Sequence, residues 1–254
     1  MNFIHILLKR LSFAISHGKG VTGKITLLHS LLSISKSTTP VPLTIKELAH
    51  PLYAQSGSDV AMMIEMFHEH EYAFPELTEI NKIIDIGANI GSASLYFSTL
   101  FPHAKIVAVE PDPQNIIKLE MNIAAYQSIT LIKGAVDSQS GYTTFYSDKN
   151  VGMSSSFIKR SPQQEPYTVT TYTINDICKQ AGWDSYDLLK FDMEGAEWNI
   201  FSHRPFILPR FIIGEYHEDL TGKTVEEFLK LFPEYISQVK RIAPQRFILK
   251  LLKQ

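Results

Sequence analysis

Residues 82–91 read KIIDIGANIG, an apolar run that ends in an acid and is followed by two glycines four positions apart. The run predicts a buried strand, and the segment 91–101 that follows has the pattern of a helix. From residue 82 to the C-terminus, short apolar runs keep alternating with helical segments. This alternation predicts an α/β fold with a doubly wound, mostly parallel sheet and helices on both faces.

The rest of the chain supplies the other elements of this sheet. The expected main strands are residues 82–86, 105–110, 128–136, 186–192 and 210–218, with added β segments at 141–147 and 166–173 and a helix at 224–232. Asp112 and Pro113 have the form of a helix start, and so do Thr173 and Asp176. Residues 236–252 predict two strands joined by a turn so short that they must pair antiparallel. Ligands of such sheets bind at the carboxyl ends of the strands, near the switch point.

Residues 1–78 show no clear strand–helix alternation, and we expect an N-terminal extension of helices and loops before a domain at 79–254. Residues 1–16 are apolar but contain two basic residues, and they are too short for a membrane span. They predict an amphipathic helix that packs on the protein or lies on a membrane surface. The segment 29–43, rich in Ser, Thr and Pro, predicts a loop, and 59–71 predicts a helix whose methionines fill the core.

The charge and the cysteine count exclude several classes of protein. The formal net charge is −2 and the basic residues are scattered, which argues against a general nucleic-acid binder. Cys178 is the only cysteine, which rules out a disulfide within the chain and a multi-cysteine zinc site. We therefore expect a cytoplasmic protein with no transmembrane segment and no nucleic-acid partner.

The glycines after the first strand indicate a class of cofactor. Gly87 lets the chain turn and approach a ligand closely, and Gly91 stands at a helix start, where a negative group is favoured. The next strand ends in Glu110, which suits two ribose hydroxyls. Nicotinamide and S-adenosylmethionine sites share this geometry, but a dinucleotide fingerprint has a further glycine where this chain has Asn89. Asp85 could hold the cationic methionine end of S-adenosylmethionine; the alternative is a plain turn with Asp85 as a structural cap.

A second informative stretch, 190–201 (KFDMEGAEWNIF), concentrates acids opposite the glycine loop. Asp192 and Glu194 sit where the fourth strand should end, and Glu197 falls in the next helix. Three acids in six residues are costly to crowd unless a positive group compensates them. The candidates are the ammonium and sulfonium of the cofactor, Lys190, or a divalent metal.

The fifth strand ends in a further pair of polar residues. Glu215 and His217 are two positions apart, so they face the same side of the strand. A histidine there could act as general base on a substrate hydroxyl, with a neighbouring acid to orient it. The alternative is a solvated histidine at the end of a strand.

Four segments together resemble the FkbM family of class I, Rossmann-like methyltransferases that depend on S-adenosylmethionine. They are residues 86–91 (IGANIG), 109–111 (VEP), 190–197 (KFDMEGAE) and 215–217 (EYH), in the order and rough spacing of that family. The resemblance covers about residues 80–218. It implies methylation of a hydroxyl on a sugar, glycan or secondary metabolite, and a sheet of order 3-2-1-4-5-7-6 with strand seven reversed.

The resemblance also implies roles for individual residues. The expected cofactor-binding residues are Asp85, Gly87, Ala88, Asn89, Gly91, Glu110, Pro111, Ala135, Val136, Asp137 and Asp192. Among them, Glu110 would take the ribose and the residues at 135–137 would flank the adenine. Asp192 and Glu194 would lie near the transferring methyl group, with His217 as the candidate base. Residues 150–157 (NVGMSSSF) also resemble a family segment, whereas Asn175 stands where the family often has aspartate.

Other interpretations stay open. A nicotinamide-dependent oxidoreductase fits the same fold, and so does a non-catalytic, methyltransferase-like binding subunit. We expect no metal, although a metal-assisted variant could use Asp192, Glu194 or His217 as ligands. The sequence does not identify the acceptor, separate O-methylation from N-methylation, or determine the oligomeric state.

Overall fold

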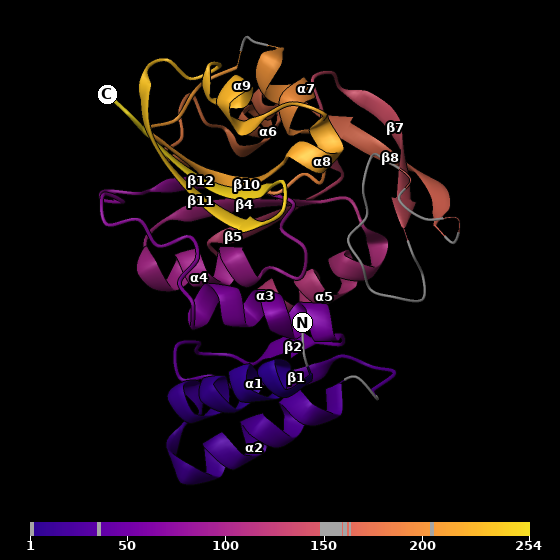
Figure 1. The fold of residues 1–254 in the computed structure, drawn as a ribbon, viewed down its shortest axis with the longest axis vertical. Coiled ribbons are helices and arrows are strands. Elements are labelled where there is room, and N and C mark those ends of the chain that lie inside the picture. The colour runs from indigo at the N-terminus through magenta and orange to yellow at the C-terminus, as the bar shows by residue number, and fades with distance from the viewer. Residues whose placement is uncertain (1–2, 35–36, 148–158, 160–161, 163, 204–205) are drawn as a thin grey trace.

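The computed structural model describes residues 3–34, 37–147, 159, 162, 164–203 and 206–254, and it is built around one seven-stranded sheet (Figure 1). The strands of this sheet are β3 (Lys82–Ile86), β4 (Lys105–Glu110), β5 (Ile129–Lys133), β9 (Leu188–Phe191), β10 (Phe211–His217), β11 (Tyr235–Ala243) and β12 (Arg246–Lys253). They lie in the order β11-β12-β10-β9-β3-β4-β5. All neighbours from β10 to β5 are parallel, and β12 pairs antiparallel with both β10 and β11.

This order confirms the predicted class I methyltransferase sheet. Counted along the chain, the seven strands lie as 3-2-1-4-5-7-6 with the seventh reversed. The predicted C-terminal hairpin is β11 and β12, whose turn is only two residues long. The four residues of β9 are all buried because helices cover both faces of the sheet.

Helices form one layer on each side of the sheet (Figure 1). One layer contains α3 (Gly57–Phe67), α4 (Ser92–Leu100) and α5 (Pro113–Ile123), and the other contains α6 (Ile174–Ala181), α7 (Glu197–Ser202), α8 (Glu218–Thr221) and α9 (Val225–Leu229). The predicted helix starts are confirmed. The carboxylate of Asp112 caps α5 by accepting from the amide of Gln114 at 2.7 Å, and Thr173 and Asp176 form a capping box on α6.

The N-terminal residues pack onto the first helical layer. They form α1 (Phe3–His17), α2 (Gly20–Ser33) and a short hairpin of β1 (Val41–Leu43) and β2 (Leu52–Ala54). Phe13 of α1 and Leu31 of α2 belong to the same hydrophobic core as Ile83 of the central sheet. The prediction that α1 packs on the protein is therefore confirmed. No helix among the described residues has the length and apolarity that a bilayer crossing requires.

Two boundaries differ from the sequence prediction. Residues 29–33 were predicted as loop but continue α2, because Leu27, Leu31 and Ile34 are spaced to bury one side of a helix. The strand predicted at 128–136 is divided at Gly134, where a side chain would meet the carbonyl oxygen of Thr170 at 2.6 Å. After this glycine, β6 (Ala135–Val136) joins β7 (Gly141–Ser147) and β8 (Glu165–Tyr172) in a separate three-stranded sheet.

Candidate functional site

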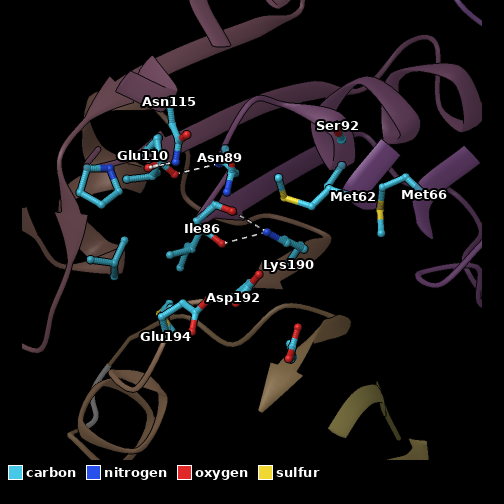
Figure 2. Close-up of a pocket in the computed structure, with 18 of the residues that line it drawn as sticks. Met62, Met66, Ile86, Asn89, Ser92, Glu110, Asn115, Lys190, Asp192 and Glu194 are labelled. Carbon is cyan, nitrogen blue, oxygen red and sulfur yellow. Dashed lines mark hydrogen bonds between the residues drawn. The ribbon is translucent and has the colours of Figure 1, made fainter. Parts of the chain in front are cut away.

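A cavity of about 320 Å³ opens at the carboxyl ends of the parallel strands, where the fold predicts a ligand site. Its walls come from four directions: the glycine loop after β3, the end of β4, the start of the small sheet, and the ends of β9 and β10. A further wall comes from α3 and the residues after it. Figure 2 shows the methionines of α3 on one side and the acids of the strand ends on the others.

The two glycines of the loop have different structural roles. Gly87 has a φ of 70° and lines the cavity, and a Cβ there would lie 1.9 Å from the carbonyl oxygen of Asp192. Gly91 does not line the cavity; it begins α4 with a φ of 89° and faces Leu119 of α5, 2.6 Å from where a Cβ would stand. The first glycine therefore brings β3 against the segment after β9, and the second brings α4 against α5.

Asp85 lies beneath the cavity rather than in its wall. It is fully buried and accepts a hydrogen bond of 2.6 Å from the hydroxyl of Ser94. Lys190 Nζ lies 3.1 Å from Asp85 Oδ1 and donates to the carbonyl oxygens of Gly87 and Ile86 at 2.7 and 3.2 Å (Figure 2). In this position Asp85 holds Lys190, which in turn ties down the glycine loop. Its predicted contact with the cofactor stays a prediction.

Glu110 ends β4 and lies at the cavity with its neighbour Pro111. One carboxylate oxygen accepts from the amide of Asn89 at 2.8 Å and the other from the amide of Asp112 at 2.9 Å (Figure 2 shows the first). Burial raises the pKa of Glu110 to about 7, although these hydrogen bonds oppose the rise. The oxygen bonded to Asp112 also accepts from the side-chain amide of Asn115 at 3.4 Å, so the oxygen bonded to Asn89 is the one that keeps capacity for a donor from a ligand.

The residues predicted to flank an adenine divide into two groups. Ala135 and Val136 form β6 and line the cavity. Asp137 does not: its Oδ1 accepts from the amide of Ser138 at 2.6 Å and from the side-chain amide of Asn199 at 2.8 Å. The apolar pair offers a flat contact for a ring, whereas the carboxylate of Asp137 is engaged elsewhere.

At the glycine loop and the start of α4, two buried polar atoms on the cavity wall have no hydrogen-bond partner in the described part of the chain. They are Oδ1 of Asn89 and the hydroxyl of Ser92. Ser92 is the first residue of α4, and that helix has no side-chain cap on its N-terminus. The uncapped amides and the helix dipole favour a carboxylate at this point. A zwitterionic ligand end therefore has both an acceptor and donors here.

At the far end of the cavity, three predicted site residues come together. Asp192 and Glu194 follow β9, and His217 ends β10. Glu194 has a φ of 49°, which is uncommon outside glycine, and Gly195 follows it with a φ of 107°. Figure 2 shows Asp192 and Glu194 on one side of Lys190. His217 is not the solvated strand-end histidine of the alternative interpretation, since it is completely buried.

The acids around His217 favour its protonated form. Its Nδ1 lies 2.7 Å from Glu197 Oε1, and Glu197 also accepts from the amide of Gly195. Burial alone would lower the pKa of His217, but hydrogen bonding to Glu197 and the carboxylates of Glu215 and Asp192 raise it to about 11. A protonated ring must lose a proton before it can accept one from a substrate. The role of His217 as general base stays a prediction.

One wall was not foreseen from the sequence. Met62, Glu65 and Met66 of α3 line the cavity, followed by Glu71 and Tyr72 (Figure 2 shows the two methionines). Met63 and Met66 are both buried in the hydrophobic core, as predicted for core filling, and Met66 also reaches the cavity. The helical pattern of this segment was visible, but no local signal shows which part of the sheet a helix will cover.

This wall is fixed to the layer behind the glycine loop. Asp59 of α3 and Lys118 of α5 form a buried ion pair with an oxygen–nitrogen distance of 2.9 Å. Asn122 of α5 donates to the carbonyl oxygen of Ile90 at 2.7 Å and binds both backbone groups of Tyr53. α5 therefore links the N-terminal residues to the glycine loop. The segment 150–157, which the resemblance also included, lies outside the described residues.

Two curated proteins resemble this chain. A 2-O-methyltransferase, NoeI, from Sinorhizobium fredii is 29% identical over 155 residues, which are 54% of this chain and 63% of that protein. The methyltransferase sdnD from Sordaria araneosa is 27% identical over 168 residues, covering 54% of this chain and 65% of that protein. In each case the similarity spans less than two thirds of the relative.

Solved structures also resemble the fold. A methyltransferase FkbM from Methylobacillus flagellatus aligns with 98% of this chain and 59% of its own, at 13% identity and a TM-score of 0.46. A fibrillarin from Aeropyrum pernix with natively bound S-adenosyl-L-methionine aligns over 70% of both chains, at 13% identity and a TM-score of 0.45. At this level of similarity neither structure informs on the function of this chain.

The match to a protein family identifies this chain more directly than these relatives and structures do. The methyltransferase FkbM domain matches residues 85–239, which is more than half of the chain. The matched region contains the glycine loop, Glu110, the acids after β9 and His217, so it includes every strand end that faces the cavity. The sequence resemblance is thereby confirmed, and the chain belongs to the FkbM methyltransferase family.

Proposed function

We propose that this protein transfers a methyl group from S-adenosylmethionine to a hydroxyl oxygen of a small molecule or glycan. The observation that carries the proposal is the arrangement of Glu110, the glycine loop and the polar cluster after β9 around one cavity. Neighbouring strands are about 4.8 Å apart, so the ends of β4 and β9, with β3 between them, lie roughly 10 Å from each other. That span suits a ligand with a ribose at one end and a reacting group at the other.

The residues of the free protein fit this cofactor. Glu110 offers an acceptor oxygen for the ribose hydroxyls, and Ala135 and Val136 offer an apolar surface for the adenine. Asn89 Oδ1 and the Ser92 hydroxyl, both without partners among the described residues, suit the ammonium and carboxylate of an amino acid. S-adenosylmethionine supplies a methyl group on a positively charged sulfur. The residues around it need only align the acceptor and exclude water.

The acceptor would lie between the α3 wall and the cluster after β9. We assign acceptor recognition to the N-terminal residues 1–78, through Met62, Glu65 and Met66, and cofactor binding to 79–254. Burial raises the pKa of Glu65 to about 7, so this wall is less negative than its composition suggests. The proton released by the acceptor hydroxyl would pass to a carboxylate of the cluster rather than to His217.

Calorimetric titration with S-adenosylhomocysteine, beside NAD, tests the cofactor class. Micromolar binding of the first alone supports the proposal, and binding of NAD alone would replace it with the oxidoreductase interpretation. Binding of neither would favour a non-catalytic subunit. Radiolabelled methyl transfer to a panel of sugars and metabolite hydroxyls then identifies the acceptor, with amines included to separate O- from N-methylation.

The pH dependence of cofactor binding should report on Glu110. Its pKa is about 7 in the free protein, and ribose hydroxyls that donate to the carboxylate would lower it in the complex. The complex then holds fewer protons than the free protein, so affinity should rise with pH up to about 7 and level off above it. Glu110→Gln should weaken S-adenosylhomocysteine binding about tenfold or more and flatten the profile.

A matched control separates this effect from general charge. Glu120 lies on α5, outside the cavity. It is half exposed and pairs with Lys133 at the surface. Glu120→Gln should keep both the affinity and the pH profile of the unmodified protein. If Glu110→Gln also keeps them, Glu110 does not contact the ribose.

A further inference from the structure

The polar cluster at the end of the cavity has one nitrogen atom with an unusual environment. His217 is fully buried, and its Nδ1 is held by Glu197 Oε1 at 2.7 Å. This contact fixes the ring so that Nε2 points at the acids of the cavity. Within the described residues, Nε2 faces three carboxylates, and although Glu215 Oε1 lies 3.2 Å away, no well-directed hydrogen bond joins Nε2 to any of them. Buried polar atoms are usually paired, so this one calls for a ligand.

The distances around Nε2 are at or slightly above those between atoms that share a metal ion. Nε2 lies 3.2 Å from Glu215 Oε1, 3.6 Å from Glu194 Oε2 and 3.9 Å from Asp192 Oδ1. Ligands bonded to one ion at about 2.1 Å stand roughly 3.0–3.4 Å from each other in octahedral or tetrahedral geometry. The ligand atoms of Asp192, Glu194 and His217 all lie within 4.8 Å of one another, so closure onto an ion requires only small side-chain movements.

The nearby cations are already engaged by other groups. Lys190 binds Asp85 and two carbonyl oxygens of the glycine loop. Arg246 lies on the outer side, with one guanidinium nitrogen 3.3 Å from Asp219 and another 3.6 Å from Glu215 and 4.0 Å from Glu194. One imidazole, that of His217, is surrounded by four carboxylates, which belong to Asp192, Glu194, Glu197 and Glu215. A dication would balance this charge better than the protons alone.

We propose that Asp192, Glu194 and His217 bind a divalent first-row metal ion, with Glu215 as a fourth ligand. Glu197 holds His217 in the way common to metal-binding histidines, in which a carboxylate binds the other ring nitrogen and orients the ring. An imidazole among carboxylates favours Mn²⁺, Fe²⁺ or Zn²⁺ over Mg²⁺. A bound ion replaces the proton on Nε2, because a metal ligand must be deprotonated.

The site stands on the geometry of the free protein, and only its use in catalysis rests on the proposed function. An ion at this place would lie beside the proposed acceptor hydroxyl and lower the pKa of that group. No other three His, Cys, Asp or Glu side chains in the described ranges bring ligand atoms so close together.

The test is a titration of chelator-treated, full-length protein with MnCl₂, without cofactor or acceptor. The readouts are calorimetry and the loss of the free Mn²⁺ signal in electron paramagnetic resonance. We expect one equivalent to bind at micromolar concentration, with nitrogen coupling from an imidazole in the pulsed spectrum. Asp192→Asn and Glu194→Gln should each weaken binding about tenfold or more, and Glu197→Gln by about ten- to a hundredfold.

The matched control is Glu71→Gln, which removes from the same cavity a carboxylate that is not a proposed ligand and acts on Glu215 only through its charge. It should change Mn²⁺ affinity less than about threefold, since only the general charge is reduced. Equal losses for Glu71→Gln and Glu194→Gln, or no binding at millimolar Mn²⁺, would overturn the proposal. Asp192 and Glu194 line the cavity, so their variants should fold even where a change at buried His217 does not.

The two titrations can distinguish failure of the metal proposal from failure of the methyltransferase proposal. S-adenosylhomocysteine binding to chelator-treated protein with no Mn²⁺ binding would reject the metal site and leave the methyltransferase proposal intact. Mn²⁺ binding with no S-adenosylhomocysteine binding would do the reverse.

Discussion

Replacing Lys190 with methionine is expected to lower the free energy of unfolding by about 3–5 kcal/mol. The Lys190 side chain is 4% exposed and Asp85 is 0% exposed, so the carboxylate would be left as an unpaired buried charge. The carbonyl oxygens of Gly87 and Ile86 would lose their donor as well. Urea denaturation followed by circular dichroism measures the change, and S-adenosylhomocysteine affinity should fall with it because the glycine loop is no longer held.

A second substitution tests the reason for this loss. The double variant Asp85→Asn with Lys190→Met removes both charges and should recover much of the lost stability, since a neutral side chain replaces the stranded carboxylate. Lys133→Met is the surface control: its ion pair with Glu120 is more than half exposed, and its loss should cost less than about 1 kcal/mol. A similar small cost for Lys190→Met would show that Asp85 does not depend on this lysine.

Replacing Gly87 with alanine should have an effect of comparable size. The added Cβ would stand 1.9 Å from the carbonyl oxygen of Asp192, a backbone atom that cannot rotate away. Overpacking of this kind, together with the strain of a φ of 70°, is expected to cost about 3 kcal/mol or more. S-adenosylhomocysteine binding should become undetectable, because the loop and the segment after β9 must separate.

Gly222→Ala is the matched control for backbone strain. Gly222 has a φ of 65°, close to that of Gly87, but no atom lies within 4 Å of where its Cβ would be. It should cost only about 1 kcal/mol and leave ligand binding unchanged. Thermal unfolding of the two variants side by side gives the comparison. Equal costs would mean that conformational strain, and not the approach to Asp192, determines the requirement for glycine at position 87.

Most of the sheet could be predicted from the sequence because its signals are local. Buried strands such as β9 appear as continuous apolar runs, and caps such as Asp112 mark where helices begin. The division of a strand at Gly134 could not be predicted, because its cause is the distant carbonyl oxygen of Thr170. The extent of α2 was obscured by serines that lie among its buried leucines.

The site was less predictable because its chemistry depends on pairs that are distant in sequence. Asp85 and Lys190 are direct neighbours across β3 and β9, and this register pairs a predicted ligand-binding acid with a buried lysine. Similarly, Glu197 holds His217 from twenty residues away and changes its protonation. A sequence shows which side chains stand at strand ends, but not which of them face each other.

The α3 wall has a consequence for how such enzymes could diversify. Met62, Glu65 and Met66 line the cavity, yet they precede the region 85–239 that defines the family. Under the proposed function, changes in this short helix would alter the shape offered to an acceptor without disturbing the strand ends that would hold the cofactor. Because Lys118 and Asn122 anchor the wall to the glycine loop, each new shape would be presented in a constant position. Acceptor specificity could thus change during evolution by substitutions in one helix. Replacing residues 57–72 with those of a relative would test whether this segment alone changes the acceptor.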